Sequence, residues 1–131
     1  MKRSKSIVSR RLYECAREVN EGLARQNLGA VRCLLSLYYG EHEGRYPAGL
    51  GGLLPAFLPS VPTLALPCTK HAPSDRVRVI KKAPSSMASL KRLLRDSGRW
   101  TYVGDPKSHL HGTFLIDCRH KDARGRTWSG L

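Results

Sequence analysis

The sequence predicts an α+β fold in which a long N-terminal helix packs on a small antiparallel β-sheet. The first observation is a proline-free run from Ser9 to Glu43 with apolar residues every three or four positions, as in a helix with one apolar face. The second is a group of glycine and proline stop signals between residues 40 and 47. The third is a pair of C-terminal segments, 99–103 and 112–118, that are rich in β-branched and aromatic residues.

The long helix has two apolar edges. The main stripe, which we expect to face a partner surface, comprises Leu12, Ala16, Val19, Leu23, Ala30, Leu34 and Leu37. A second edge, made by Val31, Leu35 and Tyr38, appears only in the C-terminal half, so that half is expected to be buried by a domain. Roughly 35 residues at about 1.5 Å each would span about 50 Å, so the N-terminal half is expected to project.

We divide the chain into the long N-terminal helix, residues 1–45, and a globular part, residues 46–131. The globular part comprises a proline-rich crossing loop (46–75), a basic insertion (76–98) and antiparallel strands (99–131). Strands that follow one another closely in sequence normally pair as neighbours. The shorter elements are expected at 50–58 (one or two helical turns), 76–80 (strand), 87–94 (helix) and 127–128 (strand or ordered tail).

The chain of 131 residues is strongly basic, with 23 Lys and Arg against 10 Asp and Glu and a net charge of +13. The excess is concentrated between residues 70 and 99. Two interpretations stay open, a solvated basic loop or a surface that binds nucleic acid, acidic lipid or an acidic protein. The candidate basic binding surface comprises Lys70, Arg76, Arg78, Lys81, Lys82, Lys91, Arg92 and Arg95.

Two of the four cysteines, Cys68 and Cys118, form a candidate disulfide that would tie the crossing loop to the sheet if the chain is exported. Together with His71 and His120 they would also offer two thiolates and two imidazoles, which suit zinc. The single residue between Cys118 and His120 makes that spacing awkward for one ion. We therefore expect two unpaired thiols, no metal and no cofactor.

The sequence contains no recognisable catalytic motif. No Ser/His/Asp or Cys/His arrangement is attached to a nucleophile elbow, and no glycine-rich phosphate loop follows a strand. We therefore expect that the chain is not an enzyme. The large C-terminal aromatic residues are expected to form the core and cross-strand pairs: Trp100, Tyr102, Phe114 and Trp128. Trp128, which lies near Arg124 and Arg126, is the one candidate for stacking on a nucleic-acid base.

Three stretches resemble the type IV pilins and the type II secretion pseudopilins. Residues 27–47 resemble the end of their long helix, with the exit pattern Tyr39, Gly44, Tyr46 and Pro47. Gly-Arg-Trp-Thr-Tyr at 98–102 resembles the Trp-x-Tyr strand of the major pseudopilin. Gly-Thr-Phe-Leu-Ile-Asp-Cys at 112–118, with the polar loop after it, resembles the next strand and the C-terminal loop.

The resemblance implies a pilin-like globular domain and a structural role in a type IV pilus or in type II protein secretion. It implies self-association, or association with other pilin-like subunits, through the N-terminal helix. Pseudopilins of this family can bind calcium in the C-terminal loop. Here Asp117 and Asp122 are the only acids of that loop and basic residues surround them, so we expect no calcium, which prefers several oxygen ligands.

The N-terminus departs from the family pattern, because it lacks the Gly-Phe-Thr-Leu-x-Glu cleavage motif and the apolar membrane segment. Residues 4–11, Ser-Lys-Ser-Ile-Val-Ser-Arg-Arg, occupy that place, and no apolar run of the roughly 18 residues needed to span a bilayer is present. As written, the chain is expected to be cytoplasmic and to be a truncated or non-assembling relative. If the native chain extends upstream, we expect the inner membrane, the periplasm or a cell-surface filament.

Overall fold

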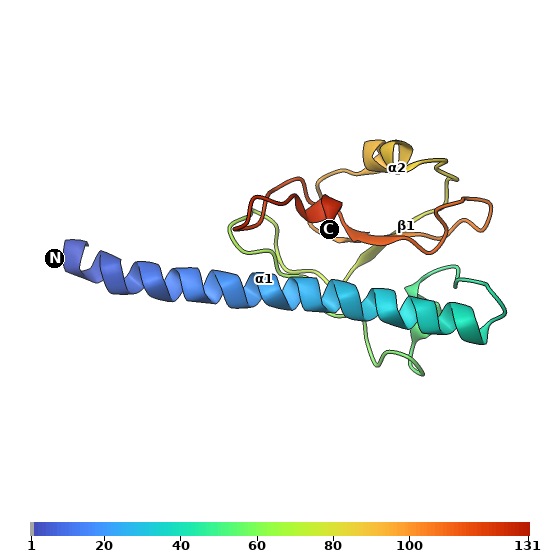
Figure 1. Ribbon diagram of the computed structural model, residues 1–131, viewed down its shortest axis with the longest axis horizontal. Helices are drawn as coiled ribbons and strands as arrows, with labels where there is room; N and C mark the ends of the chain where they lie inside the picture. The colour runs from blue at the N-terminus through green and yellow to red at the C-terminus, as the bar shows by residue number, and fades with distance from the viewer. Residues whose placement is uncertain (1) are drawn as a thin grey trace.

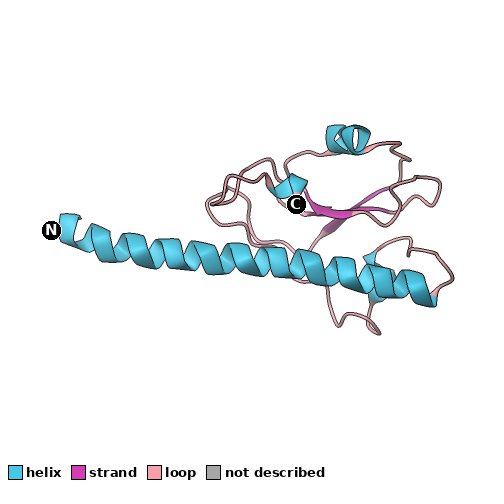
Figure 2. Cartoon of the chain, in the orientation of Figure 1, coloured by secondary structure: helices cyan, strands magenta, loops and turns pink. Residues whose placement is uncertain are grey.

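The computed structural model describes residues 2–131, with side chains described from residue 7 onward, and confirms the α+β class (Figure 1). A long helix lies along one face of a small three-stranded sheet, and a short helix covers the other face. The side chains of the basic start, residues 1–6, lie outside the described residues. Most of the globular part consists of loops, as Figure 2 shows, so side-chain contacts carry much of its stability.

Helix α1 (Lys2–Glu41) begins before the predicted Ser9 and ends two residues before the predicted Glu43. Its 40 residues at about 1.5 Å each give a length of about 60 Å, and its N-terminal end projects beyond the domain (Figure 1). The helix ends where Glu43 and Gly44 adopt left-handed φ angles of 57° and 79°. Among the described residues, no helix meets the requirement for a membrane span, a predominantly apolar stretch of 18 residues or more.

The domain does not pack on the predicted main stripe of α1. Leu23 and Leu37 of that stripe each expose 52% of their surface, and Leu34 is its one half-buried large residue. The predicted second edge packs instead and continues toward the N-terminus. The buried edge comprises Ala24, Leu28, Val31 and Leu35, with the half-buried Tyr38 beyond it. Its signal in the sequence is weak because a charged residue, the buried Glu21, occupies its N-terminal end.

The sheet is mixed, although the sequence suggested antiparallel strands throughout. The strands β1 (Val77–Ile80), β2 (Trp100–Val103) and β3 (Phe114–Ile116) lie in the order β1-β2-β3. Strands β2 and β3 are antiparallel, as predicted, but β1 runs parallel to β2. The cause is the long connection between β1 and β2, which contains a helix and can therefore return the chain to the same end of the sheet.

That connecting helix is α2 (Met87–Leu93), close to the prediction, and the Ser86 hydroxyl caps it by accepting the Ser89 N–H at 3.1 Å. The predicted turns at 50–58 reduce to the 3-10 helix η1 (Leu50–Leu53). Residues 127–128, predicted as a last strand or an ordered tail, form no strand: Thr127 makes an isolated bridge with Lys121, and Trp128 begins the 3-10 helix η2 (Trp128–Gly130).

The two faces of the sheet support separate clusters of apolar side chains. Toward α1, the rings of Trp100 and Phe114 stack with centroids 4.9 Å apart, and Tyr102 and Trp128 join the same cluster. Toward α2, Leu90 and Leu94 pack on the opposite face of β2 and β3. The predicted aromatic core is confirmed. Because Trp128 is fully buried, it is not available to stack on a nucleic-acid base.

Candidate functional site

The first candidate surface lies on the side of α1 that faces away from the domain. We call it the outer stripe, and it comprises Val8, Leu12, Cys15, Val19, Leu23, Ala30 and Leu37, all of which are exposed. Leu12 exposes 66% of its surface and Val19 64%. At 3.6 residues per turn, this stripe is centred about 150° around α1 from the buried edge. The stripe predicted to face a partner surface is therefore largely this one, and the chain's own domain is not that partner.

The second candidate surface is basic. Five of the eight predicted basic residues line one hollow of about 490 Å³ between β1 and α2: Arg78, Lys81, Lys82, Arg92 and Arg95. Arg76 lines an adjoining hollow of about 370 Å³ together with Arg78, Arg95 and Arg99. No acid is among the described residues that line either hollow. Lys70 and Lys91 are exposed and line neither.

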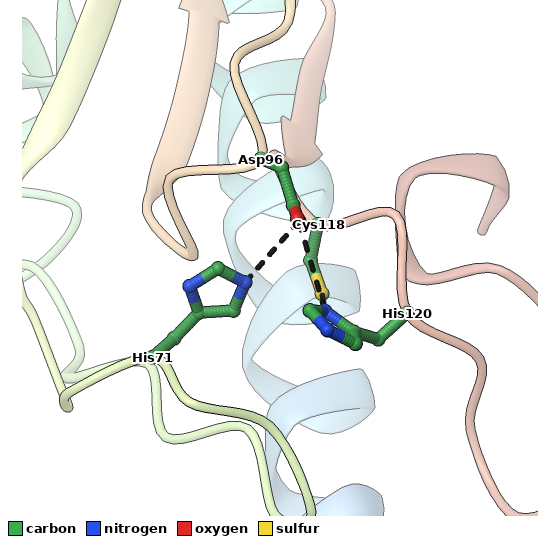
Figure 3. A group of neighbouring side chains, drawn as sticks. All are labelled: His71, Asp96, Cys118 and His120. Carbon is green, nitrogen blue, oxygen red and sulfur yellow. Dashed lines mark hydrogen bonds and ion pairs between the residues drawn. The ribbon is translucent and has the colours of Figure 1, made fainter.

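The third candidate site is a cluster of four potential metal ligands, His71, Asp96, Cys118 and His120 (Figure 3). His71 Nε2 lies 3.2 Å from Asp96 Oδ1, and His120 Nδ1 lies 3.7 Å from the same oxygen. Cys118 Sγ lies 3.3 Å from His120 Nδ1. The four potential ligand atoms lie within 4.8 Å of one another.

The cluster joins three segments that are far apart in the sequence. His71 comes from the crossing loop, Asp96 from the turn between α2 and β2, and Cys118 and His120 from the segment that follows β3. Gly98, with a φ of 71°, allows the His71 ring to approach, because a Cβ at position 98 would lie 2.3 Å from His71 Cγ. A glycine at position 98 is therefore needed for the His71 ring to lie against the backbone there.

Asp96 is held from two sides. Its Oδ1 accepts the Arg119 N–H at 2.8 Å, and its own N–H donates to the fully buried Asp117 carboxylate at 2.9 Å. That carboxylate also accepts the N–H groups of Arg95 and Ser97 and the Ser97 hydroxyl. Burial opposes ionisation of Asp96, but the hydrogen bonds from Arg119 and His71 lower its pKa below the ordinary value.

Cys118 is fully buried, and burial raises the pKa of its thiol to about 11. Cys68 is exposed and pairs with a different group, since its Sγ lies 2.6 Å from the Tyr13 hydroxyl. Both cysteines are free thiols in the structure, so the candidate Cys68–Cys118 disulfide is not formed. Of the four residues considered as zinc ligands, His71, Cys118 and His120 lie together, whereas Cys68 lies outside this group and Asp96 belongs to it.

Sequence reasoning missed Asp96 because no spacing motif connects it to the other three residues. The one available signal was the Asp-Ser-Gly sequence at 96–98, which is typical of a tight turn with left-handed residues. Asp96 and Gly98 indeed have φ angles of 54° and 71°. Such a turn can place the Asp96 carboxylate next to loops that are distant in sequence. The fold as a whole determines which loops these are.

The carboxylates of Asp117 and Asp122, weighed for calcium, are surrounded by hydrogen-bond donors. Asp122 Oδ1 accepts the Arg124 and Arg126 N–H groups at 2.9 Å each, and Oδ2 accepts the Arg126 guanidinium at 3.1 Å. Burial opposes its charge, but these hydrogen bonds lower the pKa of Asp122. Its oxygens therefore serve the C-terminal loop itself.

No protein-family model, curated protein or solved structure matches this chain.

Proposed function

We propose that the chain is a pilin-like structural subunit without a catalytic step of its own, and that it associates with copies of itself or with other pilin-like subunits through α1. The observation that carries this proposal is the outer stripe, which runs along α1 on the side opposite the domain. Its exposed apolar side chains recur every three or four residues from Val8 to Leu23, and apolar patches that stay exposed are typical of interaction sites. The resemblance of residues 27–47, 98–102 and 112–118 to pilins adds the type IV pilus and type II secretion systems as candidate settings.

The spacing of the outer stripe suits another helix as its occupant. Val8, Leu12, Cys15 and Val19 follow steps of four, three and four, the spacing with which two helices pack side by side. In the N-terminal half this stripe has no cover from the domain, since the first buried residue of α1 is Glu21 among those described from residue 7 onward. An isolated helix of this kind gains most of its stability from packing. A second α1 would supply that packing.

The assembly proposal is tested by sedimentation of the purified full chain together with oxidative cross-linking. Cys15 belongs to the outer stripe, and the exposed Cys33 lies 18 residues further along α1, which is five helical turns, so both cysteines are on the same side of the helix. We expect concentration-dependent association and cross-linked dimers through these cysteines. A chain that sediments as a monomer at every concentration and gives no cross-link would contradict the proposal.

The matched variants place one carboxylate on the stripe or beside it. We expect Val19→Glu to abolish association while the circular dichroism of the domain is retained, because the Val19 side chain is exposed in the single chain. The control Asn20→Glu adds the same group at an exposed position about a quarter turn from the stripe, and it should associate normally. Equal association of the two proteins would show that α1 does not assemble through the stripe.

The cellular location of the protein is part of the same proposal. It is tested by measuring the intact mass of the native protein and the cell fraction in which it is found. A product heavier than the 14.6 kDa of this chain in the membrane fraction supports an inner-membrane, periplasmic or filament location. A product of that mass in the cytosol supports the cytoplasmic alternative and argues against assembly into a filament.

A second candidate function, binding of nucleic acid, is favoured by the hollow between β1 and α2. Five cationic side chains converge there, and Arg78 Nη1 is held in place by donating to the Leu93 carbonyl at 2.6 Å. Neutralisation of phosphates by such side chains releases counterions, so affinity should fall steeply as salt increases.

This second function is tested by the binding of duplex DNA at low and at physiological salt. We expect the triple variant Lys81→Ala, Lys82→Ala, Arg92→Ala to bind more weakly than the control Arg10→Ala, Arg11→Ala, Arg124→Ala, which removes equal charge elsewhere. Binding that does not respond to salt, or that is equal in the two triple variants, would contradict a role for the hollow.

A further inference from the structure

We propose that His71, Asp96, Cys118 and His120 bind one zinc ion, which fastens three loops of the globular domain to one another (Figure 3). Among the described residues this is the one group of at least three His, Cys, Asp or Glu side chains whose ligand atoms converge in this way. The inference is independent of the proposed assembly through α1, because none of the four residues lies on that helix.

The donor set identifies the class of metal. Two imidazole nitrogens, one thiolate sulfur and one carboxylate oxygen are the ligand types that zinc binds in proteins, and zinc is almost always four-coordinate in structural sites. Calcium and magnesium require more oxygen ligands than this cluster has. Since all four positions come from the chain, we infer a closed structural site and no open position for a reacting water.

The spacing of the donor atoms agrees with a tetrahedron. Zinc–ligand distances of about 2.0 to 2.3 Å give tetrahedral edges of roughly 3.3 to 3.6 Å. Three of the donor pairs lie 3.2, 3.3 and 3.7 Å apart, and none exceeds 4.8 Å. Side-chain shifts of a few tenths of an ångström to about 1 Å would therefore bring all four donors to an ion at their centre.

Hydrogen bonds from neighbouring groups hold the candidate ligands in place, as is common around protein-bound metals. The Arg119 N–H donates to Asp96 Oδ1, which holds that oxygen next to the two histidine nitrogens. The Asp117 carboxylate holds the turn that carries Asp96. The backbone after the cluster is also fixed, because the His120 carbonyl accepts the Trp128 N–H at 3.1 Å and Trp128 is part of the core.

The position of the cluster gives the ion a structural task. The sheet consists of three strands of four, four and three residues, and long loops surround it. A bridge between residues 71 and 96 closes a loop of 25 residues, and Cys118 with His120 adds the C-terminal segment. Small domains with limited cores are commonly stabilised by such metal links.

An ion can reach the cluster from solvent. The sulfur is on the inner side, since Cys118 is fully buried, whereas the His120 side chain exposes 43% of its surface and the Asp96 side chain 30%. The outer ligands can therefore capture the metal before the inner thiol binds. Removal by a chelator is expected for the same reason.

The decisive experiment measures metal in the untagged full chain, because a polyhistidine tag binds zinc itself. After stripping with a chelator and adding zinc, we expect one zinc per chain, a higher melting temperature and slower hydrogen exchange around residues 71, 96 and 118. With cobalt as the probe, we expect the absorption of a tetrahedral ion and a thiolate-to-cobalt charge-transfer band. A chain that binds no stoichiometric zinc or cobalt overturns the proposal.

Variants assign the ligands. We expect His120→Ala and Asp96→Asn, at partly exposed positions, each to weaken zinc binding at least about tenfold, and Cys118→Ala to remove the charge-transfer band. His109→Ala and Cys33→Ser alter an exposed histidine and an exposed cysteine outside the cluster and should leave both signals unchanged. Because Cys118 is buried and its variant could unfold, the result with His120→Ala and Asp96→Asn is decisive, and unchanged affinity in both overturns the proposal.

Discussion

The backbone N–H of Ala123 donates to both carboxylate oxygens of Glu21, at 3.1 Å each, and so anchors the C-terminal loop to α1 across 102 residues of sequence. Glu21 is buried with only 2% of its surface exposed, and Arg17 donates to it at 3.0 Å. Arg25 lies 3.8 Å from Glu21 and 3.6 Å from Asp122. Glu21, at the N-terminal end of the buried edge, therefore has partners both on α1 and in the C-terminal loop.

The substitution Glu21→Ala should destabilise the chain by about 2 kcal/mol, because it leaves the Ala123 N–H and the Arg17 guanidinium without the carboxylate that accepts their hydrogen bonds. Urea denaturation followed by circular dichroism measures the loss. The control Glu18→Ala removes an exposed carboxylate one turn away on the same helix and should change stability by less than about 0.5 kcal/mol. Equal midpoints for the two variants would mean that the anchor contributes nothing.

Gly98→Ala tests how closely His71 approaches the backbone. The new Cβ would lie 2.3 Å from His71 Cγ, and its left-handed φ of 71° adds strain. The control Gly125→Ala has a similar φ of 79° but meets nothing within 4 Å, so it carries the strain without the clash. We expect the control to lose about 1 kcal/mol and Gly98→Ala to lose clearly more, together with zinc affinity. If both lose the same stability, the approach of His71 is not required.

Asp117→Asn should act on Asp96 without touching the ion. The carboxylate accepts N–H groups from residues 95–97, and an amide presents only one acceptor oxygen to the same donors. We expect Asp117→Asn to lower the free energy of unfolding, measured by urea denaturation, by about 1.5 to 3 kcal/mol. We also expect it to bind zinc about 10- to 100-fold more weakly. Asp75→Asn, at an exposed position, is the control for the change in charge. Unaltered zinc affinity in Asp117→Asn would remove its positioning role.

The elements that depend on local periodicity were predictable from the sequence. The spacing of apolar residues indicated α1 and α2, and the β-branched and aromatic residues indicated β2 and β3, because these signals lie within a few neighbouring residues. The parallel pairing of β1 was not predictable in the same way. It depends on the path of the connection through α2, which local patterns do not describe.

The buried edge of α1 and the fourth member of the cluster share a different difficulty. From the sequence, Glu21 is expected to face solvent. Only the structure shows that the Ala123 N–H and two arginines surround it. From the sequence, Asp96 is expected to be a turn residue. Only the structure shows that the loops that carry His71 and His120 meet there. In both places a charged side chain is defined by groups that are distant in sequence, so composition and spacing cannot identify its role.

Tyr102 provides the last test, because it connects the sheet to the exit of α1. Its hydroxyl donates to the Pro47 carbonyl at 2.5 Å, and its side chain is fully buried. His111 Nε2 lies 3.2 Å from the same carbonyl, so that oxygen keeps a neighbour in Tyr102→Phe. We therefore expect a modest loss of about 0.5 to 1.5 kcal/mol at neutral pH, against almost none for the exposed Tyr39→Phe.

The same substitution predicts a difference in pH dependence. Burial raises the pKa of Tyr102 above its ordinary value of 10, so at alkaline pH the unfolded chain loses this proton before the folded chain does. The stability that the neutral phenol contributes is complete below pH 10 and falls as the pH rises above that value. Tyr102→Phe lacks this titration, so its stability should approach that of the unmodified chain as the pH rises from 9 toward 11. A gap that stays constant over this range would mean that the Tyr102 phenol titrates alike in the folded and unfolded chains.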